Sequence, residues 1–223
     1  MTAQAHKQQD EFLEAAFDFG HWLEKHWKAL LRYIGIVLAV GVLVAAFFGW
    51  QRSQAAKARK DLAVGASAFE KAAVAQFTDF EALADALAAF EAAEARVGNS
   101  SPGPLATYYR GATLYRLGRK DEAIEALESF VAGATGDESL DWAGTALLAT
   151  LLADGGNSAR AVEVLEAVAG EGSSYPMDQV LVQLGRIHQD AGDETAARAS
   201  WQRVVDEFAQ SAYAREAQEL LAD

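Results

Sequence analysis

The pattern of hydrophobic positions divides the chain near residue 53. Residues 32–52 read RYIGIVLAVGVLVAAFFGWQR, and no charged residue lies between Arg32 and Arg52. The eighteen residues from Tyr33 to Trp50 make a helix of about 27 Å at ~1.5 Å per residue, close to the ~30 Å hydrocarbon core of a bilayer. A core helix of a small domain is rarely apolar on all faces for so long. The pattern therefore predicts a transmembrane helix at 32–52, with aromatic and arginine side chains at both interfaces.

Two alternatives to a permanent anchor stay open for this segment. A secretory signal peptide has an apolar region of about 7–15 residues behind a short basic stretch, and a small-x-small cleavage motif follows here at Ala56-Lys57-Ala58. Because the leader is longer and more acidic than that class of peptide, we expect no cleavage. The other alternative is a buried core helix. Lysine and arginine flank both ends of the segment, so charge does not decide its orientation.

Residues 1–31 form a leader whose helical spacing gathers aromatic and aliphatic side chains near one face. One interpretation is an amphipathic helix that lies on the membrane surface before the span, and the other is a solvated leader whose helix frays. The acidic residues of the leader disfavour anionic lipid, so docking would depend on its apolar face: Phe12, Ala16, Phe19, Leu23, Trp27 and Leu30.

From Gln54 onward helical segments alternate with short turns, and three stretches of sequence align with one another. They read GATLYRLGRKDEAIEALESF, ATLLADGGNSARAVEVLEAV and GRIHQDAGDETAARASWQRV. Equivalent positions recur at spacings of 38 and 36 residues. They comprise a small residue in the first helix (Gly111, Ala149, Gly185), a turn glycine (Gly118, Gly156, Gly192), an alanine that opens the second helix (Ala123, Ala161, Ala197) and a bulky residue after it (Leu127, Leu165, Trp201).

These positions have physical roles in a helix hairpin. A small side chain lets two antiparallel helices approach closely, so we expect Gly111 to lie against the region of Ala123. Glycine suits the left-handed end of the first helix. We expect each second helix to begin at a residue whose side-chain oxygen accepts a hydrogen bond from a free backbone N–H group: Asp121, Ser158 and Asp193.

This pattern resembles the tetratricopeptide repeat (TPR). The spacing slightly exceeds that family's ~34 residues, and the aromatic residue early in its first helix is replaced here by Thr107, Thr145 and Leu181. The predicted fold is therefore all-α, with a single N-terminal transmembrane helix followed by a TPR-like α-solenoid of helix hairpins at 53–223.

The solenoid is expected to have a weaker first unit and a terminal helix. Residues 53–76 predict one long helix, continuous with the span in one interpretation, and residues 79–97 predict its partner, with Ala86 and Phe90 in the small and bulky positions. The last stretch, SAYAREAQELLAD, predicts a helix that covers the open end of the array.

Charge and composition narrow the possible functions. Of the net charge of −13, residues 51–223 carry −12, which excludes the basic surface that nucleic-acid binding requires. Anionic lipid repels such a surface, apart from the basic collar just after the span. The absence of cysteine excludes disulfides, thiolate metal sites, thiol catalysis and lipid attachment through an N-terminal cysteine.

Sequence motifs for chemistry are missing as well. Nucleophile elbows, phosphate-binding loops and zinc-helix motifs do not occur. His188 occupies a packing position, and the acidic pairs are adjacent residues that do not face each other on a helix. We therefore expect no catalytic residue, no cofactor and no metal, and hence a protein that is not an enzyme.

The first helices of such a solenoid line a concave groove. Apolar or extended peptide would suit the groove side chains, although ordinary packing between repeats explains them equally well. Two arginines are too few to clamp the carboxylates of a chaperone tail. The repeat alignment places fifteen residues in the groove, and six of them are the candidate contacts: Leu105, Tyr108, Tyr115, Arg116, Val182 and Arg186. The other nine groove positions are Ala112, Ala143, Ala146, Thr150, Ala153, Asp154, Gln179, Gln189 and Asp190.

The apolar segment carries a second candidate for partner binding. Gly41, Ala45 and Gly49 are spaced by four residues and form a small-xxx-small stripe, along which another helix can pack closely. Membrane helices are rich in small residues, so ordinary composition is the alternative explanation.

The order of segments resembles a known family. An acidic aromatic leader, WLEKHWKALLRY, one span ending in GW and the basic-collared helix QRSQAAKARKDLAVGASAFEKA precede the TPR-like units. This order is similar to that of the ancillary subunit family of the bacterial Sec translocon. The members of that family are membrane-anchored proteins with a periplasmic TPR-like domain. The resemblance implies an inner-membrane protein with residues 1–31 in the cytoplasm, 32–52 in the bilayer and 53–223 in the periplasm. The implied partners are the translocon and periplasmic chaperones or client polypeptides, and the strongly aromatic leader leaves a different membrane partner open.

Two functions remain as hypotheses. The first is a non-enzymatic, membrane-anchored adaptor whose solenoid holds a partner or a client. The second is a structural assembly subunit of another envelope complex, for which self-association through the stripe would be evidence. An outer-membrane assembly lipoprotein is disfavoured because the chain has no cysteine.

Overall fold

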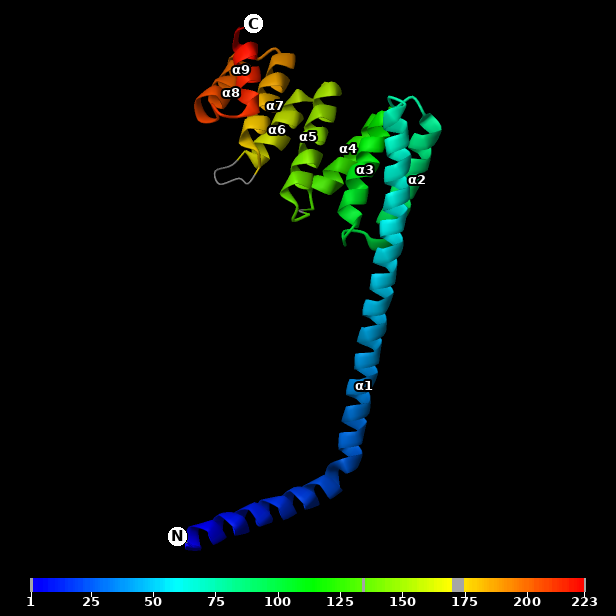
Figure 1. The fold of residues 1–223 in the computed structure, drawn as a ribbon, viewed down its shortest axis with the longest axis vertical. Helices are drawn as coiled ribbons and strands as arrows, with labels where there is room; N and C mark the ends of the chain where they lie inside the picture. Colours follow the sequence, from blue (N-terminus) through cyan, green and yellow to red (C-terminus); the bar gives the residue numbers. More distant parts are fainter. Residues whose placement is uncertain (1, 134, 170–174, 223) are drawn as a thin grey trace. The chain divides into compact units, whose positions relative to one another are not determined.

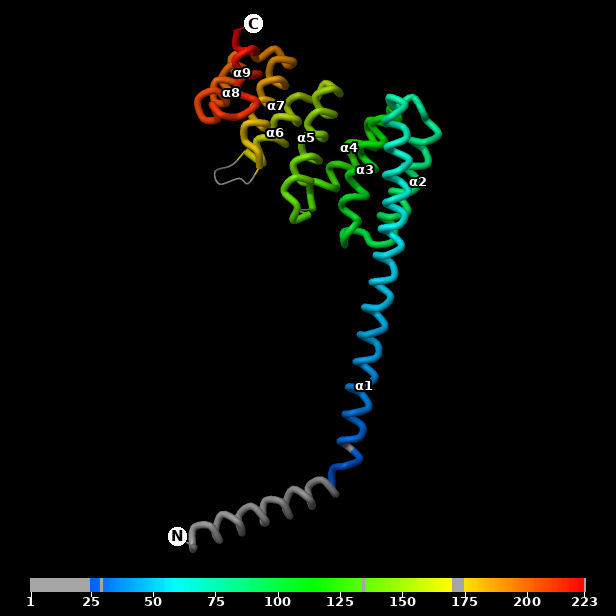
Figure 2. Tube along the Cα trace, viewed as in Figure 1, coloured from blue at the N-terminus to red at the C-terminus, as the bar shows by residue number. Residues whose placement is uncertain are grey.

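The computed structural model describes residues 2–133, 135–169 and 175–222. Side chains are described from Lys25 onward, except Ala29, so the predicted apolar face of the leader lies largely outside the described residues (Figure 2). The chain divides into two compact units, Met1–Ser53 and Gln54–Asp223. Helix α1 (Thr2–Val74) contributes to both units.

The apolar segment of the first unit is fully exposed within the chain. Among the described residues, one helix is long and apolar enough to cross a membrane, and none of its apolar window is buried. A core helix would instead be mostly buried, so the core-helix alternative does not fit. The segment is compatible with a membrane anchor by its length and composition.

The second unit is built from helix hairpins that stack one after another (Figure 1). Sequence neighbours pack together, and α3 contacts α5, α5 contacts α7 and α7 contacts α9, so the first helices of successive hairpins lie side by side. The described residues contain helices and no strand, which confirms the all-α prediction. Besides the end of α1, the helices are α2 (Phe80–Val97), α3 (Gly103–Arg116), α4 (Lys120–Val131), α5 (Glu138–Asp154), α6 (Ser158–Val168), α7 (Met177–Asp190), α8 (Glu194–Glu207) and α9 (Ala212–Ala222).

The α1–α2, α3–α4 and α7–α8 hairpins cross closely where a glycine of the first helix faces a bulky residue of the second. A Cβ atom on Gly111 would lie 2.7 Å from Cγ of Leu127, and a Cβ atom on Gly65 would lie 2.6 Å from Cε1 of Phe90. Gly185 faces the indole of Trp201 in the same way. The close approach at Gly111 is as predicted, but its opposite residue is Leu127, one turn beyond Ala123.

The turns between paired helices follow the predicted glycines. Gly118, Gly156 and Gly192 have φ angles of 77°, 80° and 81°, a left-handed conformation that glycine adopts without a steric penalty. The predicted helix starts are only partly right. Asp193 caps α8 by accepting from the backbone N–H of Ala196 at 3.0 Å. The cap of α6 is Asn157 instead of Ser158, and α4 begins after Arg119, which makes no side-chain cap.

The hydrophobic core continues through the stacked hairpins. One cluster joins buried leucines of α3 to α7, including Leu127, Leu148 and Leu165. A second cluster surrounds Trp201 and includes Ala217 of α9, so the terminal helix covers the last hairpin as predicted. The small-x-small motif lies inside α1, and Ala58 is fully buried against helices α2 and α3.

Candidate functional site

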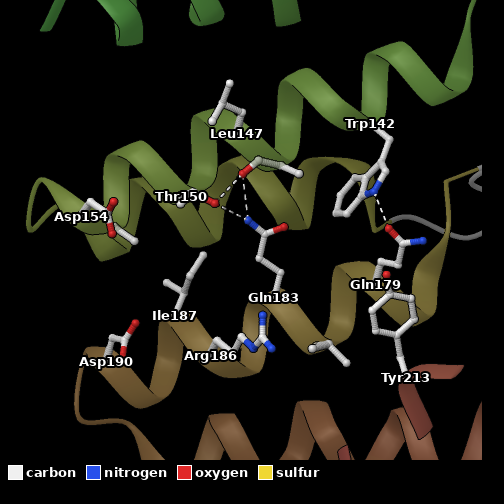
Figure 3. Close-up of a pocket in the computed structure, with 13 residues that line it drawn as sticks. Trp142, Leu147, Thr150, Asp154, Gln179, Gln183, Arg186, Ile187, Asp190 and Tyr213 are labelled. Atoms are coloured by element: carbon white, nitrogen blue, oxygen red, sulfur yellow. Dashed lines mark hydrogen bonds between the residues drawn. The ribbon is translucent and has the colours of Figure 1, made fainter. Parts of the chain in front are cut away.

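A pocket of about 520 Å³ opens between α5, α7 and the start of α9 (Figure 3). Its walls are the facing sides of two first helices, which is the position where a solenoid forms its groove. Val182 and Arg186, two of the six candidate contacts, line it. The volume lies within the range of pockets that take part of a polypeptide or a small ligand.

Hydrogen bonds from side chains connect the two walls. Nε2 of Gln183 on α7 donates to the carbonyl oxygen of Ala146 at 2.8 Å and to Oγ1 of Thr150 at 3.0 Å, both on α5. Further along, Nε1 of Trp142 donates to Oε1 of Gln179 at 2.9 Å. These bonds fix the spacing of α5 and α7, so the pocket is a built feature of the hairpin stack (Figure 3).

The two ends of the pocket differ in chemistry. Asp154 and Asp190 lie near one end, whereas Trp142 and Tyr213 lie near the other (Figure 3). Asp190 makes no hydrogen bond or ion pair with the described residues. Arg186 stands between the ends and pairs with Glu216 of α9 at 2.5 Å, which neutralises the one basic side chain of the lining. The pocket therefore presents an acidic end and an aromatic end.

The predicted residues of the first copy lie elsewhere. Tyr108 is half-buried, with its ring centroid 5.3 Å from that of Tyr109 and 6.0 Å from that of Phe130, and burial raises the pKa of its phenol. Leu105 is half-buried on α3. Neither residue lines the pocket.

Tyr115 and Arg116 connect α3 to its neighbours. The hydroxyl of Tyr115 donates to Oδ2 of Asp154 at 3.2 Å, and burial together with this bond raises the pKa of the phenol. The guanidinium of Arg116 lies 4.3 Å from the centroid of the Phe77 ring, a distance typical of a cation–π contact. Both side chains are thus engaged within the unit.

Five residues of the pocket were missed by the repeat alignment: Trp142, Leu147, Gln183, Ile187 and Tyr213. Helical spacing could have found two of them, because Trp142 stands four residues before Ala146 and Gln183 stands four residues after Gln179. Tyr213 had no such signal, since it belongs to the terminal helix outside the repeats.

The stripe of small residues in the first unit is open to a partner. Gly41, Ala45 and Gly49 are exposed, and a Cβ atom added at either glycine would meet nothing within 4 Å. Close approach of another helix is sterically possible there.

Comparisons with known proteins identify the repeats. The tetratricopeptide repeat family matches residues 105–132 and 179–211, which correspond to the first and last copies of the aligned unit. A crystal structure of a tetratricopeptide repeat protein from Parabacteroides merdae ATCC 43184 is similar with a TM-score of 0.51. The described helices of the second unit have a TPR-like arrangement.

The similarity has defined limits. The structural match has 19% identity and covers 71% of this chain and 59% of the other, so it shows the fold of the TPR-like unit alone. This chain spans less than two thirds of that protein's length. The comparison with curated proteins found no match. TPR repeats are protein-interaction modules, which makes binding of protein partners the general role of the unit.

Proposed function

We propose that this protein is a non-enzymatic, membrane-anchored adaptor whose TPR-like unit binds a polypeptide partner. The observation that carries the proposal is the combination, in one chain, of an uncovered apolar helix and an open pocket between first helices. The helix supplies attachment to a bilayer. The pocket supplies a surface for recognition, because polar groups converge on a partly apolar concavity there.

The partner segment is an extended polypeptide that carries a basic side chain. Asp190 is an exposed carboxylate that has no partner among the described residues, and a lysine or arginine of the segment would form an ion pair with it. The indole of Trp142 and the ring of Tyr213 offer flat apolar surface to the neighbouring residues of the segment.

The proposed setting is the bacterial inner membrane. Support comes from the order of leader, apolar helix, basic collar and repeats, which resembles the ancillary subunits of the Sec translocon. In this setting the N-terminus is cytoplasmic, the TPR-like unit is periplasmic, and the unit links the translocon to periplasmic chaperones or client proteins.

The test is affinity purification of the full-length protein from membranes in mild detergent, with mass spectrometry of the proteins that copurify. A chain beginning at Gln54 serves as the comparison. Translocon subunits that follow the full chain and are lost without the apolar helix would support the proposal. Recovery of a different envelope complex without translocon subunits would contradict the proposed setting.

The pocket is tested by a pair of charge reversals. We expect Asp190→Lys to reduce recovery of periplasmic partners several-fold. The substitution replaces the carboxylate with a positive charge, which repels the basic side chain of the partner segment. Glu125→Lys is the matched control, since Glu125 is also exposed and unpaired within the described part of the chain but lies on α4, outside the pocket. Equal recovery with both variants would exclude the pocket as the binding surface.

The alternative function, a structural assembly subunit, is favoured by the open stripe at Gly41, Ala45 and Gly49. Replacing all three residues with isoleucine would block close helix packing. A change in the size of the detergent-solubilised complex would support assembly through the stripe, and an unchanged size would count against it.

A further inference from the structure

Seven of the fourteen basic side chains in the TPR-like unit form ion pairs with described residues, and three of those without one lie together near the start of the unit. Six arginines form ion pairs with acidic side chains, for example Arg96 with Asp61 and Arg110 with Glu94. Lys57, Arg59 and Lys60 are exposed and form no ion pair or hydrogen bond with the described residues. We call these three residues the collar.

The collar is a basic cluster in a unit that is otherwise strongly acidic. No acidic residue occurs between positions 51 and 60, whereas residues 61–223 contain 11 basic and 27 acidic residues. The nearest acid on the same helix, Asp61, is already bound to Arg96. The positive charge of the collar is therefore not neutralised by the unit to which it belongs.

The collar follows the apolar segment at a short distance along the helix. Lys57 lies seven positions after Trp50 and Lys60 lies ten positions after it, which corresponds to about 10 and 15 Å of helix. Side chains on a helix lean toward its N-terminus. The polar zone on each side of a bilayer's hydrocarbon core is about 5–8 Å thick, and long lysine and arginine side chains can reach back to it.

We propose that the collar binds the phosphate groups of anionic phospholipids in the leaflet from which the TPR-like unit emerges. This inference rests on the membrane anchor of the proposed function. Cationic side chains near an anionic surface attract it, while the acidic remainder of the unit is repelled. The collar thus holds the start of the solenoid at the membrane surface, and the repulsion turns the rest of the unit away from the lipid.

The test uses the full-length protein in vesicles that contain phosphatidylcholine and phosphatidylglycerol. Incorporation is measured first, by flotation after alkaline carbonate treatment. The protein is then extracted in mild detergent, and native mass spectrometry gives the ratio of phosphatidylglycerol to phosphatidylcholine bound to it. The variant Lys57→Gln with Lys60→Gln is compared with Lys120→Gln with Arg215→Gln, which also removes two exposed, unpaired charges. Glutamine keeps helix propensity close to that of lysine.

The expected result is that the wild type and the control variant bind phosphatidylglycerol in preference to phosphatidylcholine. In the collar variant, the ratio of bound phosphatidylglycerol to bound phosphatidylcholine should fall by up to about five-fold for each lysine removed. An unchanged ratio in the collar variant, or an equal loss in the control, overturns the inference. It is also overturned if the collar variant keeps its lipid ratio but loses an acidic protein that copurifies with the wild type.

The failure of the inference and the failure of the anchor give different results. A chain that enters vesicles without preference for phosphatidylglycerol overturns the collar alone. A chain that stays out of the vesicles overturns both the anchor and the collar.

Discussion

The pairing of a small residue with a bulky one explains how hairpins that differ in sequence can each bring their two helices close together. Gly111 faces Leu127, whereas Gly185 faces the much larger indole of Trp201. Trp201 is 2% exposed, and its Nε1 donates to the carbonyl oxygen of Val182 at 3.4 Å, so the ring is fixed at the crossing. Interiors are close-packed, and a side chain added opposite such a ring has no free volume to enter.

We predict that Gly185→Ala destabilises the TPR-like unit by about 1–3 kcal/mol, the range typical of overpacked cores. An ordinary glycine in a helix would give the opposite sign, because alanine gains about 1 kcal/mol there. Urea unfolding followed by circular dichroism measures the free energy of unfolding. Combining Gly185→Ala with Trp201→Leu should cost less than the sum of the two single changes, and additive costs would argue against the crossing contact.

At the scale of the helices, one position decides how the second helix of each hairpin begins. The N-cap is the residue directly after the turn glycine: Arg119, Asn157 and Asp193. The sequence predicted the helices and their turns correctly because the glycines and alanines repeat. It placed two starts too late, because Asp121 and Ser158 are good capping residue types that lie inside the first turn. The left-handed backbone conformation of the turn glycine determines where the second helix begins, whichever side chain occupies the cap position.

We predict that Asp193→Ala lowers the free energy of unfolding by about 1 kcal/mol, since it removes an acceptor for a free backbone N–H group of α8. Arg119→Ala changes the equivalent position of α4, where no side chain caps the helix, and should have a much smaller effect. Chemical denaturation of both variants measures the difference. Equal destabilisation would contradict the assignment of the cap.

The pocket shows why a repeat alignment predicts the fold of the unit better than it predicts the residues of the groove. Equivalent positions are not equivalent in packing, because the residues between neighbouring first helices differ from copy to copy. Tyr108 enters an aromatic cluster with Tyr109 and Phe130, and Tyr115 reaches across to Asp154. Between α5, α7 and α9 the side chains leave an open concavity, and Tyr213 reaches it from outside the repeats.

At the scale of the whole molecule, α1 belongs both to the apolar segment and to the solenoid. Ala58 is fully buried in a cluster with Ala93 and Ala106, so the start of the second unit contributes to its core. The potential cleavage motif at Ala56-Lys57-Ala58 therefore lies within helix that the unit uses for packing. Cleavage there would remove core contacts together with the apolar segment and part of the collar.

We therefore predict that the protein purified from membranes retains its apolar segment. Intact-mass measurement should give the full chain of about 23.9 kDa, apart from N-terminal methionine processing. A chain that begins at Arg59 would show that the segment is a signal peptide, and it would lack the buried Ala58. An Ala56→Leu variant separates the two cases further, because it removes one small residue of the motif at an exposed position. Its mass should match the wild type with only the substitution, since no processing is expected in either protein.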